Sequence, residues 1–394
     1  MSSATLASPK ASPAAPSQQD LWFTRCPVPT AFTLALQLGL FDNEFSGEEG
    51  ISFLSLQQSP DPRVHRSHFD HTQPNSFRHG GNVPAIWAKA TGADTRLIGL
   101  SWVTTTHPLL TLPSSGIRTV ADLKGRRLAV AKRTRETAID FWRATTIRIY
   151  ETALATAGLT LADVKLVEID VDRLHIDPEA IKESRNRSLF NGRNRRGGHR
   201  ESIAALIRGD VDVIPGQGTH GTDYSTFLGA NVVFDVGRDI PDKVARANNA
   251  YPEALTVSGR LAADHPDLVA RVVARVIEAA EWAKTHHRET VTFIAREQGA
   301  AEDLVELTYG PELSQTFEVN LADDKVAAIA SQKAFLLRNK FIPADFDLKA
   351  WIDHRPLALA HELVAKRRKS SGFDGPNLKL PAEGREVSPA SCSI

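Results

Sequence analysis

Short apolar runs alternate with stretches of helical periodicity along most of this chain. Apolar side chains recurring every three or four residues predict helices, and compact apolar runs predict strands. Helices are predicted over 29–40, 84–90, 120–125, 139–158 and 201–209. Strands are predicted over 51–56, 96–103, 126–131, 165–169, 211–214, 231–236 and 254–258. After residue 264 the pattern is almost entirely helical. Such alternation is typical of an α/β protein.

The order of these elements predicts two α/β lobes and a helical end, as in the type II periplasmic-binding-protein-like fold. Lobe I is expected to comprise residues 20–115 and 238–369, and lobe II residues 116–237. Such lobes close over a ligand by hinge motion. Residues 1–19 and 370–394 are rich in small and polar residues and are expected to be disordered tails.

Composition narrows the possible functions. Of 394 residues, 42% are apolar and 24% charged, with 47 basic and 47 acidic side chains. A net charge of zero does not favour nucleic acid or an anionic membrane as a partner. A basic stretch at 185–200 is expected to be a solvated loop or a lid. Two distant cysteines and no signal-peptide pattern predict a reducing, cytoplasmic setting, and we expect a monomer.

Cys26 is the first candidate for chemistry. It follows Thr24 closely and precedes Pro27 and Pro29, so it cannot lie inside a helix. The segment is predicted to be a strand end that turns into a helix, where a thiol can face a cleft. The alternative is that Cys26 is a small buried apolar residue.

Residues 68–84 are dense in functional side chains. His68 could act as an acid, a base or a thiolate partner, and Arg78 could hold an anion through its planar fork. Gly80 and Gly81 leave backbone amides accessible before a helix, a geometry that suits an oxyanion. The histidines could equally be surface residues. His68 and His71 have ligand-like spacing, but no supporting metal motif accompanies them.

Several of these residues together resemble a known family. The matching segments are Cys26-Pro27-Val28-Pro29, His68-Phe69, Gln73-Pro74, Arg78, Gly80-Gly81, 121–127, 209–212, Asn249-Ala250-Tyr251, Thr256-Val257-Ser258 and Trp282-Ala283. In this order the chain resembles the aromatic sulfinate desulfinases, within a wider group that includes sulfonate-binding and thiamine-precursor-binding proteins.

The resemblance implies a hydrolase that cleaves a carbon–sulfur bond with water and releases sulfite. It implies Cys26, His68 and Arg78 as catalytic residues, with Thr24, Gly80 and Gly81 binding a small organic sulfinate. It also implies that no metal and no organic cofactor is needed. Cys26 could donate a proton to the ring carbon or attack sulfur as a thiolate, and the sequence leaves both open.

The chain departs from the family at residues 215–222. These residues are small and polar, whereas the desulfinases are rich in aromatic residues at this place. A smaller or more polar sulfinate than a biphenyl is therefore expected. Trp102 and Trp142 could line the cleft but are expected in the core, and His107 is expected at a hinge. A non-catalytic binding protein for a sulfonate or thiamine precursor is the main alternative. An enzyme of thiamine-pyrimidine synthesis fits less well, because its cysteine-rich and histidine-rich patterns are absent from the sequence.

Overall fold

A five-stranded sheet with the order β2-β1-β3-β10-β4 forms the base of the first lobe. The structure is a computed structural model, and it describes residues 19–24, 26–46, 50–172, 174–176 and 199–371. The strands are β1 (Gln19–Thr24), β2 (Ile51–Ser55), β3 (Ser76–Gly80), β4 (Thr95–Ser101) and β10 (Glu253–Ser258). β1 is parallel to β2 and β3, whereas β10 is antiparallel to β3 and β4. Because β10 comes from a distant part of the chain, the chain leaves this lobe and later returns.

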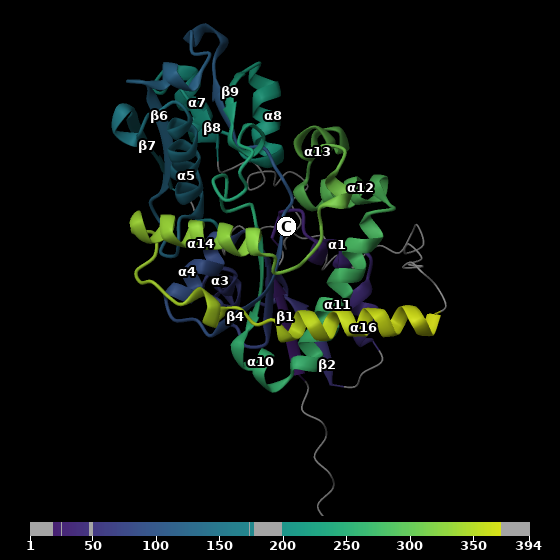
Figure 1. The fold of residues 1–394 in the computed structure, drawn as a ribbon. Helices are drawn as coiled ribbons and strands as arrows, with labels where there is room; N and C mark the ends of the chain where they lie inside the picture. The colour runs from purple at the N-terminus through teal and green to yellow at the C-terminus, as the bar shows by residue number, and fades with distance from the viewer. Residues whose placement is uncertain (1–18, 25, 47–49, 173, 177–198, 372–394) are drawn as a thin grey trace, which may run out of the picture.

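The second lobe is formed by the chain between these two crossings (Figure 1). Its elements are β5 (Pro108–Thr111), β6 (Arg127–Arg133), α5 (Phe141–Thr156), β7 (Lys165–Val171), α7 (Arg200–Arg208), β8 (Ile214–Pro215), α8 (Gly218–Leu228), β9 (Asn231–Asp235) and α9 (Val236–Asp239). β5 pairs with both β8 and β9, and β6 pairs with β7. The first crossing therefore lies between β4 and β5, and the boundary expected at residue 115 is too late. The cause is the short apolar strand β5, which the sequence pattern did not distinguish from a connection.

Helices cover the first lobe and complete its C-terminal side. They are α1 (Ala31–Gln37), α2 (Leu40–Phe45), α3 (Pro62–Asp70), α4 (Asn82–Ala90), α10 (Gly259–Asp264), α11 (Pro266–Ala283), α12 (His287–Gln298), α13 (Glu302–Tyr309), α14 (Asp323–Arg338), α15 (Leu348–Trp351) and α16 (Arg355–Ser371). The predicted α/β class and the helical C-terminal portion are thus confirmed. None of the described helices is long and apolar enough to cross a membrane.

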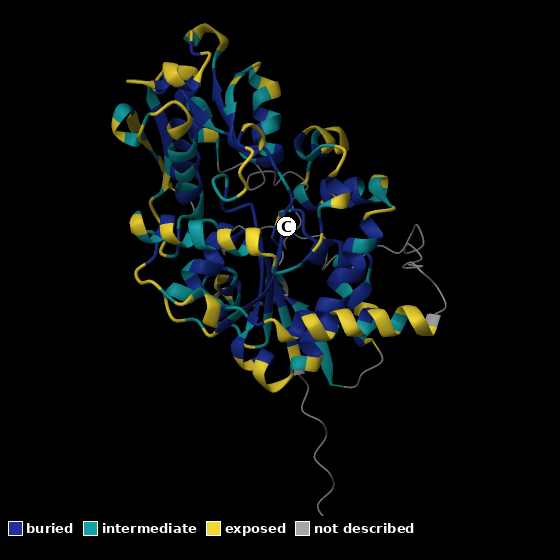
Figure 2. Ribbon diagram, viewed as in Figure 1, coloured by how far each residue is buried: buried dark blue, intermediate teal, exposed yellow. Residues whose placement is uncertain are grey.

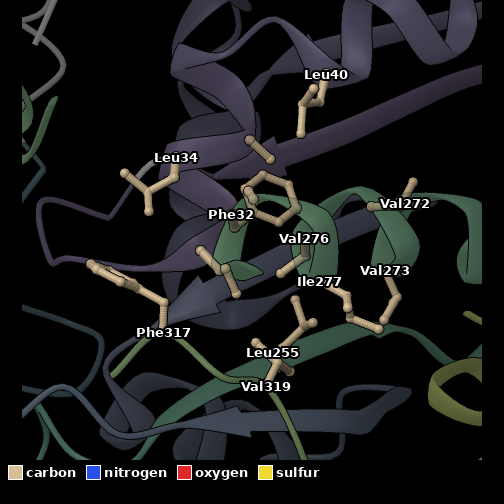
Figure 3. Packing of buried hydrophobic residues seen from close by; sticks show 14 of the residues in the cluster. Phe32, Leu34, Leu40, Leu255, Val272, Val273, Val276, Ile277, Phe317 and Val319 are labelled. Atoms are coloured by element: carbon tan, nitrogen blue, oxygen red, sulfur yellow. The ribbon is translucent and has the colours of Figure 1, made fainter. Parts of the chain in front are cut away.

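Two large apolar clusters hold the elements together. Figure 2 shows that buried residues occur in both lobes. In the first cluster, α1 and α11 pack over the sheet, with Phe32 facing Val276 and Leu255 beneath them (Figure 3). The second cluster joins the lobes, because Ile86 of α4 and Ile147 and Tyr150 of α5 belong to the same packed group. If the second lobe moves about a hinge, the residues of this shared core must therefore either move together with it or repack.

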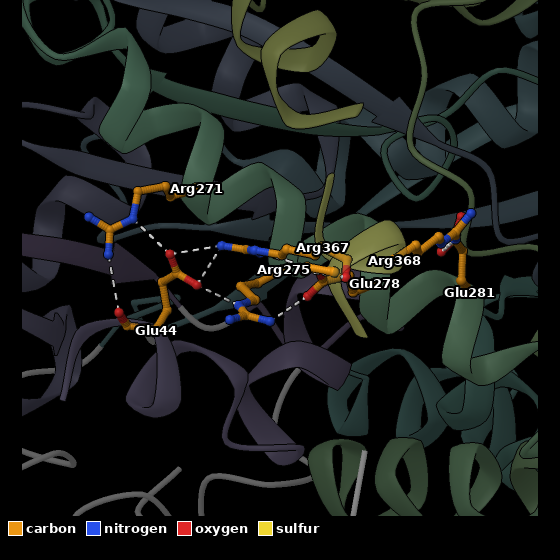
Figure 4. A network of polar contacts seen from close by, with 8 residues as sticks. Glu44, Arg271, Arg275, Glu278, Glu281, Arg367 and Arg368 are labelled. Atoms are coloured by element: carbon orange, nitrogen blue, oxygen red, sulfur yellow. Dashed lines mark hydrogen bonds and ion pairs between the residues drawn. The ribbon is translucent and has the colours of Figure 1, made fainter. Parts of the chain in front are cut away.

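Glu44 of α2 connects α11 to α16 through a network of ion pairs (Figure 4). Its carboxylate accepts from Arg271 and Arg275 at 2.7 Å each and from Arg367 at 2.8 Å. Arg275 and Arg367 also bond to Glu278. Burial alone would raise the pKa of Glu44, but the three guanidinium groups bring it below its ordinary value. The network fixes the long C-terminal helix on the side of the first lobe.

Two elements that carry candidate residues were not predicted. Residues 62–70 form α3, which begins with Asp61 accepting from the Arg63 amide and with a proline in its first turn. Residues 76–80 form β3, an inner strand of the sheet. The predicted tails lie outside the described residues, except that Gln19 begins β1 and residues 370–371 end α16. The basic stretch 185–200 also lies outside them, apart from its last two residues.

Candidate functional site

The register of two neighbouring strands brings the candidate residues together. β1 and β3 are parallel, and Thr24 pairs with Arg78. Directly paired residues project from the same face of a sheet. Cys26, two residues beyond Thr24, is therefore level with Gly80. Parallel strands end at the same edge of their sheet, so these residues lie together where both strands end.

The Cys26 sulfur lies directly against Gly80. A β-carbon added to Gly80 would overlap with both the sulfur and the β-carbon of Cys26. Cys26 is only 4% exposed, and α1 begins shortly after it with Thr30 as its N-cap. The non-helical segment between strand and helix, which the two prolines predicted, thus holds the thiol inside the protein. Gly80 acts here by leaving space for the thiol.

The Thr24 hydroxyl is hydrogen-bonded to the imidazole of His68. Thr24 Oγ1 and His68 Nδ1 are 2.5 Å apart. Thr24 is buried, and His68 is half-buried in the last turn of α3. In the sequence the Thr24 hydroxyl lies close to Cys26, but in the structure its hydrogen-bond partner is His68. This bond leaves the other ring nitrogen of His68 for substrate or water.

Arg78 is a buried cation with backbone partners. Its Nη1 donates to the Gly81 carbonyl at 2.7 Å, and its Nε donates to the His68 carbonyl at 3.3 Å. Its exposed fraction is 4%. Within the described part of the chain, Arg78 forms no ion pair with a carboxylate. Since a buried charge needs compensation, this arrangement is suited to an anionic ligand.

The same contacts set the protonation states of the site. Burial raises the pKa of the Cys26 thiol, Arg78 partly offsets this increase, and the charge of Glu297 adds to it. Burial lowers the pKa of His68 well below its usual value, and the nearby Arg78, His71 and His175 lower it further. At neutral pH the resting site therefore holds a thiol, a neutral imidazole and a guanidinium ion. A resting thiolate–imidazolium pair does not fit this environment.

The start of α4 differs from the sequence-based expectation. The helix begins at Asn82, and the Asn82 and Val83 amides donate to the carbonyl and side-chain oxygens of Asn249, at 2.9 and 3.0 Å. A β-carbon added to Gly81 would be 2.6 Å from that side-chain oxygen. An anion expected at this helix start would have to displace Asn249. Asn249 was a matching residue in the sequence, but its spacing gave no sign of this role.

Aromatic rings from the second lobe reach the neighbourhood of His68. Phe69 of α3 packs on Phe141 of α5 with ring centroids 6.2 Å apart, and Phe141 stacks on His175 at 4.2 Å. Trp142 meets the ring of His199 at 4.6 Å, edge to face. The second lobe therefore supplies aromatic surface near the site even though residues 215–222 are polar. The sequence raised Trp142 as a possible cleft residue and expected it in the core, whereas it is half-buried. Sequence reasoning missed the other rings, because they come from the start of α5 and from a connecting segment.

The remaining candidates lie elsewhere in the structure. Trp102 packs against Tyr251 at 5.4 Å. His107 is fully buried at the first crossing, where its Nδ1 is 2.7 Å from the Tyr251 hydroxyl. Both residues stabilise the connection between the lobes. Among the described residues, no group of three or more His, Cys, Asp or Glu side chains could hold a metal ion.

The architecture is that of the periplasmic-binding-protein fold. The periplasmic aliphatic sulphonate-binding protein SsuA from Escherichia coli is similar over 86% of this chain and 92% of its own, with a TM-score of 0.57 and 17% identity. This likeness establishes the bilobal α/β fold. No protein-family model matches the chain.

The chain is also a distant homologue of 2'-hydroxybiphenyl-2-sulfinate desulfinase. The proteins of that name from Rhodococcus erythropolis and Rhodococcus qingshengii are each 27% identical to it over 355 residues, or 85% of this chain and 91% of theirs. A crystal structure of the desulfurization enzyme DszB has a TM-score of 0.67 and 25% identity, and covers 87% of this chain and 99% of its own. A DszB cysteine-to-serine mutant in complex with biphenyl-2-sulfinic acid has a TM-score of 0.70 and 24% identity.

Proposed function

We propose that the protein is a cofactor-free hydrolase that removes the sulfinate group from an organic, aromatic sulfinate and releases sulfite. The observation that carries this proposal is the buried Arg78, without a carboxylate partner among the described residues, beside the buried Cys26 thiol. A guanidinium fork matches the two oxygens of a sulfinate. The homology to a desulfinase, and the DszB cysteine mutant crystallised with a sulfinic acid, support the same class of reaction.

The protonation states favour Cys26 as a proton donor. In the proposed step, the S–H proton moves to the ring carbon while the carbon–sulfur bond breaks. The electron pair of the carbon–sulfur bond forms the new carbon–hydrogen bond. Sulfur leaves as sulfur dioxide, which takes up water to give hydrogen sulfite and one proton. That proton returns to the Cys26 thiolate, with His68 as the relay. The net reaction consumes one sulfinate and one water and yields the arene and hydrogen sulfite.

The bound substrate would strengthen this arrangement. A sulfinate paired with Arg78 places negative charge beside the thiol, and a nearby negative charge raises a thiol pKa further. The thiol therefore stays protonated until the ring carbon takes its proton. The thiolate-attack alternative would require the opposite change in pKa at the moment of binding.

Sulfite release from benzenesulfinate and biphenyl-2-sulfinate tests the proposal. We expect the wild-type chain to release sulfite and the Cys26→Ser variant to lose at least about a hundredfold in rate, since general acid catalysis contributes that much or more. Cys392→Ser is the matched control, because it removes the other cysteine, and it should retain full activity. Equal rates for Cys26→Ser and wild type would overturn the proposal.

A non-catalytic sulfonate-binding protein is the competing function, favoured by the fold that the chain shares with SsuA. Such a protein would bind a sulfonate tightly, release no sulfite from any sulfinate, and be unaffected by Cys26→Ser. Calorimetric titration with benzenesulfonate, run beside the sulfite assay, separates the two functions.

A further inference from the structure

The side chain of Asn249 has a fixed orientation at the start of α4. Its Oδ1 accepts from the Val83 amide at 3.0 Å, and the Asn249 carbonyl accepts from the Asn82 amide at 2.9 Å. Because the Val83 N–H can only donate, the oxygen of the Asn249 side chain must face the helix. The side-chain nitrogen, Nδ2, is therefore a donor that the helix does not use.

This nitrogen is available to a ligand. Asn249 is only 6% exposed, yet its Nδ2 has no hydrogen-bond partner within the described part of the chain. Nδ2 is also not one of the unpartnered atoms that are sealed off from solvent. Nη2 of Arg78 is in the same state, since Nε and Nη1 donate to backbone carbonyls. Donors of buried side chains normally have partners, so two open donors indicate a place for an acceptor.

Gly81 brings these two donors together. Arg78 Nη1 donates to the Gly81 carbonyl at 2.7 Å. A β-carbon added to Gly81 would be 2.8 Å from Asn249 Nδ2, so the Asn249 amide lies directly on the Gly81 backbone. The Cys26 sulfur lies in the same way against Gly80. The thiol, the guanidinium group and the amide thus contact two consecutive glycines.

The turn that carries Asn249 is held in place by its neighbours. Asn82 Nδ2 donates to the carbonyls of Asn248 and Pro252, at 2.6 and 2.9 Å. Asn248 Oδ1 accepts from the Asn249 amide at 2.7 Å. A donor that is already fixed needs little reorganisation when an anion binds. Because the Asn249 side-chain oxygen accepts from the positive end of α4, its amide is polarised and Nδ2 becomes a stronger donor.

We propose that Asn249 is a substrate-binding residue, whose Nδ2 donates to one oxygen of the sulfinate group while Arg78 Nη2 donates to the other. The inference rests on the sulfinate function proposed above. Two donors that hold both oxygens fix the sulfur, and with it the ring carbon, relative to the Cys26 thiol. The anion that the sequence predicted at the start of α4 thus meets the Asn249 amide in place of the helix amides.

Calorimetric titration with benzenesulfinate tests the inference, in a Cys26→Ser background so that the ligand is not consumed. Asn249→Ala should weaken binding by about tenfold or more, because it removes a hydrogen bond to a charged group. Asn249→Asp should weaken binding further, because a carboxylate has no donor and repels the anion. Asn43→Asp, at an exposed position of α2, is the control for the added charge and should leave the affinity within about twofold.

Melting temperatures separate a role in binding from a role in α4 alone. A carboxylate at position 249 can still accept from the Val83 amide, so Asn249→Asp should melt closer to the background protein than Asn249→Ala. The two variants should therefore rank in opposite orders in stability and in affinity. An unchanged affinity in Asn249→Ala, or an order of affinities that follows the order of stabilities, would overturn the inference.

Turnover separates this inference from the proposed reaction. If the wild-type chain releases sulfite and Asn249→Ala does so with the same kcat/KM, the inference fails and the proposed function stands. If no sulfinate yields sulfite but the two variants rank in opposite orders as expected, the proposed function fails and Asn249 remains an anion-binding residue. No binding of benzenesulfinate to the Cys26→Ser chain or to wild type would overturn both.

Discussion

The sulfur of Cys26 occupies the position that a side chain of Gly80 would fill. This relationship follows from the pairing of Thr24 with Arg78, which makes the segment after β1 level with the end of β3. The thiol can be buried beside Arg78 because residue 80 has no β-carbon. The two residues therefore depend on each other: a larger residue at position 80 must displace the sulfur.

Gly80→Ala should both destabilise the protein and displace the thiol. Overpacking of a buried contact costs about 1–3 kcal/mol, so the thermal midpoint should fall and sulfite release should be lost. The double variant Cys26→Gly/Gly80→Ala removes the overlap. Compared with Gly80→Ala, it should recover most of the lost stability but no activity. Calorimetric melting beside the sulfite assay checks both effects. A Gly80→Ala variant with wild-type midpoint and rate would contradict the contact.

Thr24 should matter through its hydroxyl group. Thr24→Val keeps the shape but removes the bond to His68, and it leaves a buried ring nitrogen without its partner, at a cost of about 1–3 kcal/mol. Thr24→Ser keeps the hydroxyl and should remain close to wild type in rate. We expect Thr24→Val to lower kcat more than KM, because a misplaced imidazole impairs the proton relay. Similar kcat values for the Val and Ser variants would argue against a role for this bond.

The protonation of Cys26 can be measured by alkylation. In a Cys392→Ser background, the rate of reaction with iodoacetamide should rise with pH through a midpoint above the ordinary cysteine value, because burial raises the pKa. Arg78→Gln removes a positive charge and should move the midpoint upward, whereas Glu297→Gln removes a negative charge and should move it downward. The unfolded chain provides the reference midpoint. Shifts of the same sign in both variants would refute the assigned electrostatics.

Glu253 should make the protein less stable as pH rises. Burial raises its pKa to about 8 in the folded protein, so between an ordinary value near 4.5 and about 8 the folded state keeps a proton that the unfolded state has lost. The free energy of unfolding therefore decreases across this interval. Glu253→Gln removes the effect and can still accept from Ser101. The melting temperature of Glu253→Gln minus that of wild type should be larger at pH 8.5 than at pH 5. An equal difference at the two pH values would show that Glu253 does not titrate in this interval.

Much of this protein could be predicted from local sequence. The prolines after Cys26 excluded a helix at that position, and the alternation of apolar runs with helical spacing gave the α/β class and most of its elements. The strand β3 and helix α3 escaped this reasoning, because polar residues such as Arg78, His79 and His68 dominate their sequences. Their apolar positions are too few to establish a period, and tertiary burial stabilises them instead.

The sequence by itself determined which residue types are available for chemistry and that Cys26 lies where a strand end turns toward a helix in an α/β protein. Only the tertiary structure decided their partners: Thr24 bonds His68, Gly80 makes room for the sulfur, and Asn249 occupies the start of α4. The physical reason is the range of the interactions. Periodicity and backbone restriction act over a few residues, whereas strand register and side-chain contacts join segments far apart in the chain, and their geometry is fixed only when the core packs.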